Sequence, residues 1–225
     1  MSQQPSLNET LAEFQAKRAE TMPADKLKVN VDQRRLLVET AERSNFVKAG
    51  DKIEPFELTE VDSGPLSLAA LVREGPVVLI FFRFAGCPAC NIALPYYNHH
   101  LAPELHGLGA TLVGVSPQIP DRLRDIKERH KLDFQIATDA DNSLGRRFGI
   151  LYSFDEPSRR LSAESGSPIG EVTGTGTWQL PMPAAIVIDQ SGIVRFADVS
   201  PDWLVRTEPA DIIAAVRAIT TRAAA

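Results

Sequence analysis

One short segment limits what this chain can fold into more than any other: an apolar run that leads directly into two cysteines. Residues 76–90 read PVVLIFFRFAGCPAC, and Cys87 and Cys90 are the only two cysteines in the 225 residues. The run over 77–82 is rich in β-branched and aromatic residues and too short for a helix, which is typical of a buried strand. Residues 91–105 then place apolar side chains at three- and four-residue spacing, which predicts a helix packed on a sheet. We therefore expect the cysteines where a central strand turns into a helix.

This position favours thiol chemistry. The first turn of a helix presents unpaired N–H groups and the positive end of the macrodipole, and both stabilise a thiolate. With Cys87 as the N-cap, Pro88 falls at the first helical position, where its missing N–H costs nothing. Cys90 lies one turn further along, close enough to attack an oxidised Cys87 sulfur. We predict Cys87 as the exposed nucleophile and Cys90 as the resolving thiol, with Arg83 as a nearby positive charge of unknown direction.

The cysteine pair has two other interpretations. It is half of a zinc site if His99, His100 or His106 completes the ligand set. A continuous helix rises ~1.5 Å per residue, however, so Cys90 and His99 would lie ~13 Å apart, too far for one metal. The second reading is a pair of inert core cysteines. Redox chemistry is favoured over both, and we expect neither a metal nor a cofactor.

Composition limits the partners. The formal charge of −5 and the absence of a basic run argue against nucleic acid as the main partner. The longest apolar stretch, 77–82, is too short to span a bilayer, so no membrane partner is expected. Residues 1–5 show no basic or apolar region of a signal peptide. The expected location is the cytoplasm, where a Cys-x-x-Cys pair is more often catalytic than structural.

The chain divides into an extension over 1–48 and a larger domain over 49–225. Within the extension, residues 6–20 and 24–44 have the patterns of two helices, the second rich in charge. These helices can pack against the domain or against a second subunit. Packing against a second subunit makes a homodimer plausible. A solvated arm with little function is the alternative.

The domain alternates strands with helices, which implies parallel neighbouring strands joined by right-handed crossovers. Its last two strands are close enough to form an antiparallel hairpin. The predicted elements are a hairpin over 50–63, helices over 68–73, 121–131, 142–148 and 209–222, and strands over 110–115, 134–137, 184–189 and 193–197. The fold class is therefore α/β, with a mixed central sheet flanked by helices and an N-terminal helical extension.

Residues 150–180 interrupt this alternation. Gly166, Gly170, Gly174 and Gly176 lie in the segment, and none leads into Lys followed by Ser or Thr, which excludes a phosphate-binding P-loop. We expect an insertion loop in which Trp178 covers the site, with simple packing of the indole as the alternative.

The order of these motifs resembles the thioredoxin fold. After the strand, Cys-Pro-Ala-Cys and the helix come VGVSP at 113–117 and PAAIVIDQSG at 183–192. The chain is most similar to the peroxiredoxin-like branch of the AhpC/TSA group, over roughly 49–220. Pro95 agrees, because thioredoxin-like proteins carry a helix-kinking proline there. The resemblance implies that residues 49–225 form a thioredoxin-like domain.

The resemblance also implies a role for Pro183. It stands just before the penultimate strand, where the family has a cis-proline that faces the redox pair. A cis bond at this point turns the Met182 backbone toward a bound thiol partner. Pro183 and Met182 are thus expected beside the cysteines.

The departures from the family pattern concern the peroxide clamp. Peroxiredoxins usually carry Pro-x-x-x-Thr-x-x-Cys, but Ile80 and Phe84 stand where the proline and threonine belong. The family's distant arginine falls at or near Pro183, which leaves Arg83 as a substitute. The buried aspartate of thioredoxin itself is replaced by Phe81. The chain is therefore neither a standard peroxiredoxin nor a standard thioredoxin.

The resemblance implies a thiol peroxidase, an antioxidant enzyme that reduces hydrogen peroxide or organic hydroperoxides through Cys87. Condensation with Cys90 gives a disulfide that thioredoxin or a similar dithiol reduces. A thioredoxin-like oxidoreductase acting on protein disulfides is the alternative, and a non-catalytic binding protein with the same fold is a third. The residues expected to contact the substrate or partner are Arg83, Pro88, Trp178, Met182 and Pro183.

Overall fold

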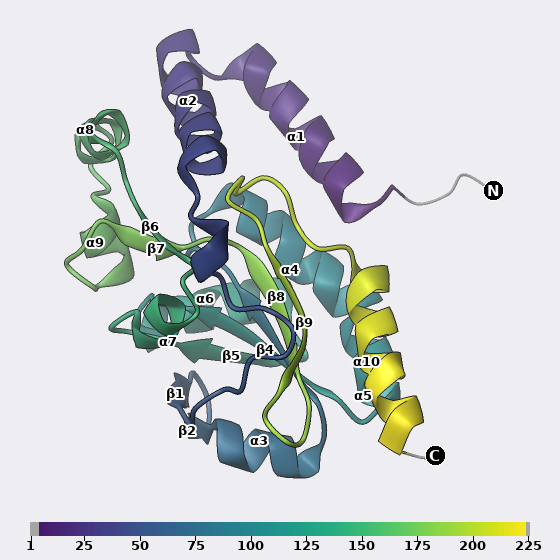
Figure 1. Cartoon of the computed structure of the whole chain (residues 1–225). Coiled ribbons are helices and arrows are strands. Elements are labelled where there is room, and N and C mark those ends of the chain that lie inside the picture. The colour runs from purple at the N-terminus through teal and green to yellow at the C-terminus, as the bar shows by residue number, and fades with distance from the viewer. Residues whose placement is uncertain (1–4, 224–225) are drawn as a thin grey trace.

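The computed structural model describes residues 5–223, which form a mixed seven-stranded sheet with helices packed against it (Figure 1). The helices are α1 (Leu7–Thr21), α2 (Ala24–Thr40), α3 (Leu68–Glu74), α4 (Pro88–His100), α5 (Ala102–Gly107), α6 (Pro120–His130), α7 (Ser143–Arg147), α8 (Glu156–Glu164), α9 (Ile169–Thr173) and α10 (Pro209–Ala223). The strands are β1 (Glu57–Glu60), β2 (Gly64–Ser67), β3 (Val77–Phe81), β4 (Thr111–Ser116), β5 (Gln135–Thr138), β6 (Leu151–Ser153), β7 (Gln179–Pro181), β8 (Ala184–Ile188) and β9 (Val194–Val199). The predicted fold class is confirmed.

Strand β3 lies inside the sheet, whose strand order is β2-β1-β5-β4-β3-β8-β9. It pairs in parallel with β4 and antiparallel with β8, and all five of its residues are buried. Burial on both faces explains why the strand is continuously apolar rather than alternating. The β8–β9 hairpin is antiparallel, as expected, and β1–β2 is also an antiparallel hairpin, although its second strand lies beyond the predicted range of 50–63. The strand that precedes the cysteines is therefore paired with a neighbouring strand along each of its edges.

The N-terminal extension is docked on the rest of the chain and is not a solvated arm. Ser6 and Glu9 form a capping box at the start of α1. The backbone N–H groups of Leu7 and Asn8 donate to the Glu208 carboxylate, at 3.1 and 2.9 Å. Leu7 and Leu11 are fully buried, and α1 packs against α4. Figure 1 shows α1 and α2 together at one end of the molecule, beyond the sheet.

Residues 150–180 are more ordered than the sequence suggested, so the expectation of an insertion loop is wrong. The segment forms β6, α8, α9 and β7, and β6 pairs antiparallel with β7. Asp155 caps α8 by accepting a hydrogen bond from the Ser158 backbone N–H at 3.1 Å. Helix α8 packs against α2, so the segment gains part of its order from tertiary contact with the extension. Within residues 5–223, no helix has both the length and the apolar character that a membrane span requires.

Candidate active site

The two cysteines lie where the sequence predicts, at the turn from β3 into α4. Cys87 is the N-cap of α4, Pro88 occupies the first turn, and the Cys87 sulfur accepts a hydrogen bond from the Cys90 backbone N–H at 3.4 Å. Both cysteines are free thiols. The Cys87 sulfur therefore sits against the positive end of the helix, the placement that lowers a thiol pKa.

Side chains from neighbouring elements hold this turn in place. Gln118, after β4, accepts a hydrogen bond from the Ala85 backbone N–H at 2.7 Å. Asn91 donates to the carbonyl oxygens of Ala85 and Cys87, at 2.7 and 2.9 Å. His130 at the end of α6 shares a 2.7 Å hydrogen bond with the Asn91 side chain. Hydrogen bonds from neighbouring side chains thus fix the turn that carries Cys87.

The prediction that Cys87 is exposed is wrong, because both cysteines have no exposed surface. Helix α1 packs against α4, and Arg206 lies against Cys90 with its Nη2 3.9 Å from the Cys90 sulfur. The surroundings are nevertheless charged rather than purely apolar, since Arg83 and Arg206 are both buried at this site.

The two thiols are electrostatically unlike. Burial acts to raise the pKa of Cys87, but the Cys90 thiol, Arg83 and Arg206 outweigh it and lower that pKa to about 6. Burial and the neighbouring Cys87 charge instead raise the pKa of Cys90 well above its usual value. Near neutral pH, Cys87 is therefore a thiolate and Cys90 a thiol that donates to it.

Arg83 and Tyr152 bring two unpaired polar atoms to the same place. Arg83 is 7% exposed and Tyr152 is 5% exposed; the two side chains interact with each other, but neither Arg83 Nε nor the Tyr152 hydroxyl makes a hydrogen bond of full geometry. Burial raises the pKa of Tyr152 to about 12, so its hydroxyl keeps its proton. Both side chains interact electrostatically with Cys87. Unpaired buried donors beside a nucleophile are suited to binding the oxygen atoms of a small reactant.

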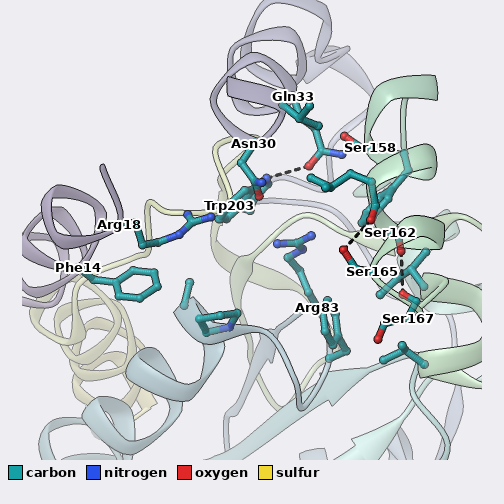
Figure 2. Close-up of a pocket in the computed structure, with 18 residues that line it drawn as sticks. Phe14, Arg18, Asn30, Gln33, Arg83, Ser158, Ser162, Ser165, Ser167 and Trp203 are labelled. Carbon is teal, nitrogen blue, oxygen red and sulfur yellow. Dashed lines mark hydrogen bonds between the residues drawn. The ribbon is translucent and has the colours of Figure 1, made fainter. Parts of the chain in front are cut away.

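A cavity of about 230 Å³ opens in front of this turn. Figure 2 shows Arg83 reaching into it, with Arg18 and Trp203 along one side and the serines of the α8 region along the other. The guanidinium carbon of Arg83 lies 4.6 Å from the centre of the Trp203 ring, a cation–π contact. Pro88 and Ala89, which follow Cys87 in the chain, form part of the lining, whereas neither cysteine does.

Three of the predicted site residues, like both cysteines, do not line this cavity. Trp178 packs near Phe154, with ring centres 6.3 Å apart, and neither Trp178 nor Met182 nor Pro183 lines the cavity. The expected cis bond before Pro183 is wrong, because none of the described peptide bonds is cis. The Met182 backbone N–H donates to the Ile150 carbonyl at 2.7 Å. It is therefore already paired and does not point toward an incoming thiol partner.

No sequence pattern predicted Arg206, Trp203 or Tyr152 at this site. Arg206 is 116 positions from Cys90 and lies in an irregular stretch before α10. The stretch is fixed by the Tyr97 hydroxyl, which donates to the Thr207 carbonyl at 2.8 Å. No local sequence pattern predicts a contact between residues so far apart in the chain. The described residues contain no group of three or more His, Cys, Asp or Glu side chains placed to hold a metal ion.

Comparison with known proteins provides evidence of family membership that does not depend on the geometry of the site. A model of the AhpC/TSA family matches residues 49–197. Peroxiredoxin Bcp of Escherichia coli K12 is 28% identical over 107 residues, which cover 47% of this chain and 67% of that protein.

Solved structures show the same fold. The peroxidoxin BcpB of Mycobacterium tuberculosis superposes with a TM-score of 0.60 at 24% identity, covering 77% of this chain and 98% of that one. The reduced 2-Cys peroxiredoxin of Plasmodium vivax gives a TM-score of 0.60 at 15% identity, covering 80% and 100%. The matched family segment contains both cysteines but ends before Trp203 and Arg206.

Proposed function

The chain belongs to the AhpC/TSA family, and from this premise we propose a thiol-dependent peroxidase in which Cys87 attacks the peroxide and Cys90 resolves the product. The observation that carries the proposal is the Cys87 thiolate, buried at a helix N-terminus beside Arg83 and Arg206. A low thiol pKa at pH 7 provides the reactive form without a separate base.

In the first step, the Cys87 thiolate attacks the terminal oxygen of the hydroperoxide. A sulfur–oxygen bond forms, the oxygen–oxygen bond breaks, and the leaving oxygen departs with the electron pair and takes a proton from water. Cys87 is thereby oxidised to a sulfenic acid. The unpaired Arg83 Nε and the protonated Tyr152 hydroxyl supply donors where negative charge develops on that oxygen. They stand in for the threonine–arginine clamp that the sequence lacks.

In the second step, the Cys90 sulfur attacks the sulfenic sulfur. A disulfide forms, and the hydroxyl group leaves as water with the Cys90 proton. Two electrons from a thioredoxin-type dithiol then restore both thiols. The raised pKa of Cys90 keeps it protonated until Cys87 is oxidised, because the thiolate that it faces is removed in the first step.

Two observations favour a peroxide over a protein disulfide as the substrate. Cys87 has no exposed surface in the reduced protein, so a peroxide reaches it with less rearrangement than a disulfide in a folded partner, and reduction of the Cys87–Cys90 disulfide by a thioredoxin-type dithiol requires the turn to open. The Met182 backbone N–H, expected to face a partner, is bonded to Ile150. Both support the peroxidase over the thiol–disulfide oxidoreductase.

Three further features belong to the same proposal. The reductant is a thioredoxin-type dithiol, and the protein works in the cytoplasm, where its free cysteines stay reduced. A homodimer is supported by Val31, Leu36 and Val38, which remain exposed on α2. Sedimentation analysis tests the homodimer.

The function is tested by following peroxide consumption with thioredoxin and its reductase. The wild-type protein should turn over, and Cys87→Ser should lower the rate at least about a thousandfold because the nucleophile is gone. Cys90→Ser should still react once with peroxide but should form no intramolecular disulfide. Insulin reduction without peroxide turnover would instead select the disulfide oxidoreductase.

A further inference from the structure

The cavity beside the Cys87 turn is built partly by segments of the chain outside the family segment, although most of its lining residues lie within that segment. Helix α1 contributes Phe14 and Arg18, α2 contributes Asn30 and Gln33, and the stretch before α10 contributes Trp203. These residues lie before residue 49 or after residue 197, the limits of the AhpC/TSA match. The cysteines and most of the cavity lining therefore come from the family fold, while part of the lining comes from additions to that fold.

The wall is mainly apolar and aromatic. Its apolar lining consists of Phe14, Val29, Phe84, Pro88, Ala89, Phe154, Leu161, Ile169, Val172 and Trp203. Two of the serines in the lining are engaged within the α8 region, since Ser165 donates to the Leu161 carbonyl at 2.7 Å and Ser162 to the Ser167 carbonyl at 2.8 Å. Hydrogen peroxide needs no such wall, whereas the organic group of a larger hydroperoxide does.

Trp203 is the centre of the charged part of this wall. Its indole N–H donates to the Gln33 side-chain oxygen at 3.1 Å, which fixes the ring. The guanidinium carbons of Arg18, Arg34 and Arg83 lie 5.7, 5.6 and 4.6 Å from the ring centre. Three cations thus surround one indole.

Only one of these three cations is neutralised. Arg34 forms a two-bond ion pair with Asp202, at 2.6 and 2.7 Å. Arg18 and Arg83 form no ion pair with any residue in 5–223, and Arg18 donates only to the Gln15 side chain and the Met22 sulfur. No carboxylate lines the cavity. The pocket therefore combines apolar walls with two arginines that lack an acidic partner.

The two unneutralised arginines have different positions. Arg83 follows β3, lies beside Cys87 and is already assigned to the thiolate and the peroxide oxygens. Arg18 lies on α1, at the side of the cavity formed by the extension (Figure 2). Its remaining N–H donors are available to a group placed away from the reacting oxygen atoms.

From this arrangement we propose that the cavity binds the organic part of an apolar hydroperoxide that carries a carboxylate, and that Arg18 binds this carboxylate. The inference rests on the peroxidase function proposed above and narrows its substrate class. Arg18 is a specificity residue for the reaction, because it contacts the substrate away from the bond that breaks.

The test uses a matched pair of substrates: cumene hydroperoxide bearing a para carboxylate and the methyl ester of the same molecule. The measured quantity is the ratio of kcat/KM for the acid to kcat/KM for the ester. Wild type should favour the acid. In Arg18→Gln this ratio should fall about tenfold, as expected for loss of a hydrogen bond to a charged group. Arg18→Lys should restore part of it.

The matched control is Lys17→Gln, which removes one positive charge from an exposed neighbouring position on α1. It should leave the substrate ratio unchanged, because Lys17 does not line the cavity. An Arg18→Gln ratio equal to that of wild type overturns the assignment. So does an equal fall in both variants, which would show only long-range attraction by the helix's charge.

Calorimetric titration separates this inference from the peroxidase function. Reduced wild-type protein should bind 4-isopropylbenzoate more tightly than 4-isopropylbenzyl alcohol, and Arg18→Gln should lose that preference. If no hydroperoxide is consumed but the preference is found, the peroxidase proposal fails and the anion pocket stands. If peroxide is consumed without the preference, the pocket assignment fails.

Discussion

The strand–helix junction that carries the cysteines and the wall that faces it are built in opposite ways. The junction is a short continuous segment, with Cys87 capping α4 directly after β3 and Cys90 one turn further. The wall is assembled from α1, α2, the α8–α9 segment and the stretch around Trp203, which are far apart in the chain. Local sequence thus determines the nucleophile, and tertiary assembly determines what can reach it.

The two regions meet at the buried arginines. Arg83 follows β3 directly but points into the space that the wall encloses (Figure 2). Arg206 arrives from the stretch before α10 and contacts Cys90. The low pKa of Cys87 therefore depends on one charge from each region. Removing either arginine, or destabilising the packing of the wall, tests how much the reactivity of Cys87 depends on the residues around the junction.

The largest effect is expected for Arg83→Met. The change removes a positive charge and an unpaired donor from the side of Cys87, so the Cys87 pKa should rise and the developing oxygen charge should lose a partner. The second-order rate constant for hydrogen peroxide at pH 7 should fall roughly a hundredfold. Stopped-flow reaction of the reduced protein measures it.

Arg206→Met is the contrasting variant, because Arg206 contacts Cys90 and the carbonyls of Trp203 and Val205. It should raise the Cys87 pKa with a smaller loss of rate than Arg83→Met. Equal losses in both variants would mean that Arg83 acts through its charge alone and does not bind the peroxide.

A smaller effect is expected for Leu11→Ala, which loosens the wall without touching the junction. Leu11 is fully buried between α1 and the domain, and truncating such a leucine costs about 2–5 kcal/mol. Opening of α1 should become more frequent, so Cys87 should react several times faster with a bulky maleimide than in wild type. Iodoacetamide should show a smaller increase, because it needs less space.

The control for this prediction is Leu36→Ala, at a leucine on α2 that is 41% exposed. It should leave both alkylation rates close to those of wild type. Acceleration of the same size for Leu11→Ala and Leu36→Ala would show that the extension does not shield the cysteine.

The sequence was sufficient for most of the fold because the buried elements have strong local patterns. The all-apolar β3, the Pro88 that follows Cys87 and the Ser67 cap of α3 each specify their own conformation. The wrong expectations depend mainly on tertiary contact instead. Part of the order of residues 150–180 comes from packing of α8 against α2, which no local pattern reveals, whereas the Asp155 cap and Pro157 at the start of α8 are local signals that the expectation of a loop overlooked.

The candidate site divides in the same way. Cys87, Cys90, Arg83 and Pro88 lie in one motif, so the sequence brought them together. Burial of Cys87 requires α1 and the stretch carrying Arg206, both distant in sequence. The family resemblance places Met182 and Pro183 beside the redox pair, and the pairing of Phe81 with Ala184 puts Pro183 next to the end of the strand that leads to Cys87, although the expected cis bond is wrong. The family resemblance predicted the arrangement of strands and helices better than it predicted the side chains around the Cys87 sulfur.

The most direct test of the account is the pH dependence of the reaction between reduced wild-type protein and hydrogen peroxide. The pKa of Cys87 is lowered from 9.0 to about 6, so the thiolate forms as pH rises through this value. The rate constant should rise to half its maximum near pH 6 and be nearly level above pH 7. A rate that is still increasing through pH 8 to 9 would contradict the claim that the buried arginines and Cys90 keep Cys87 ionised.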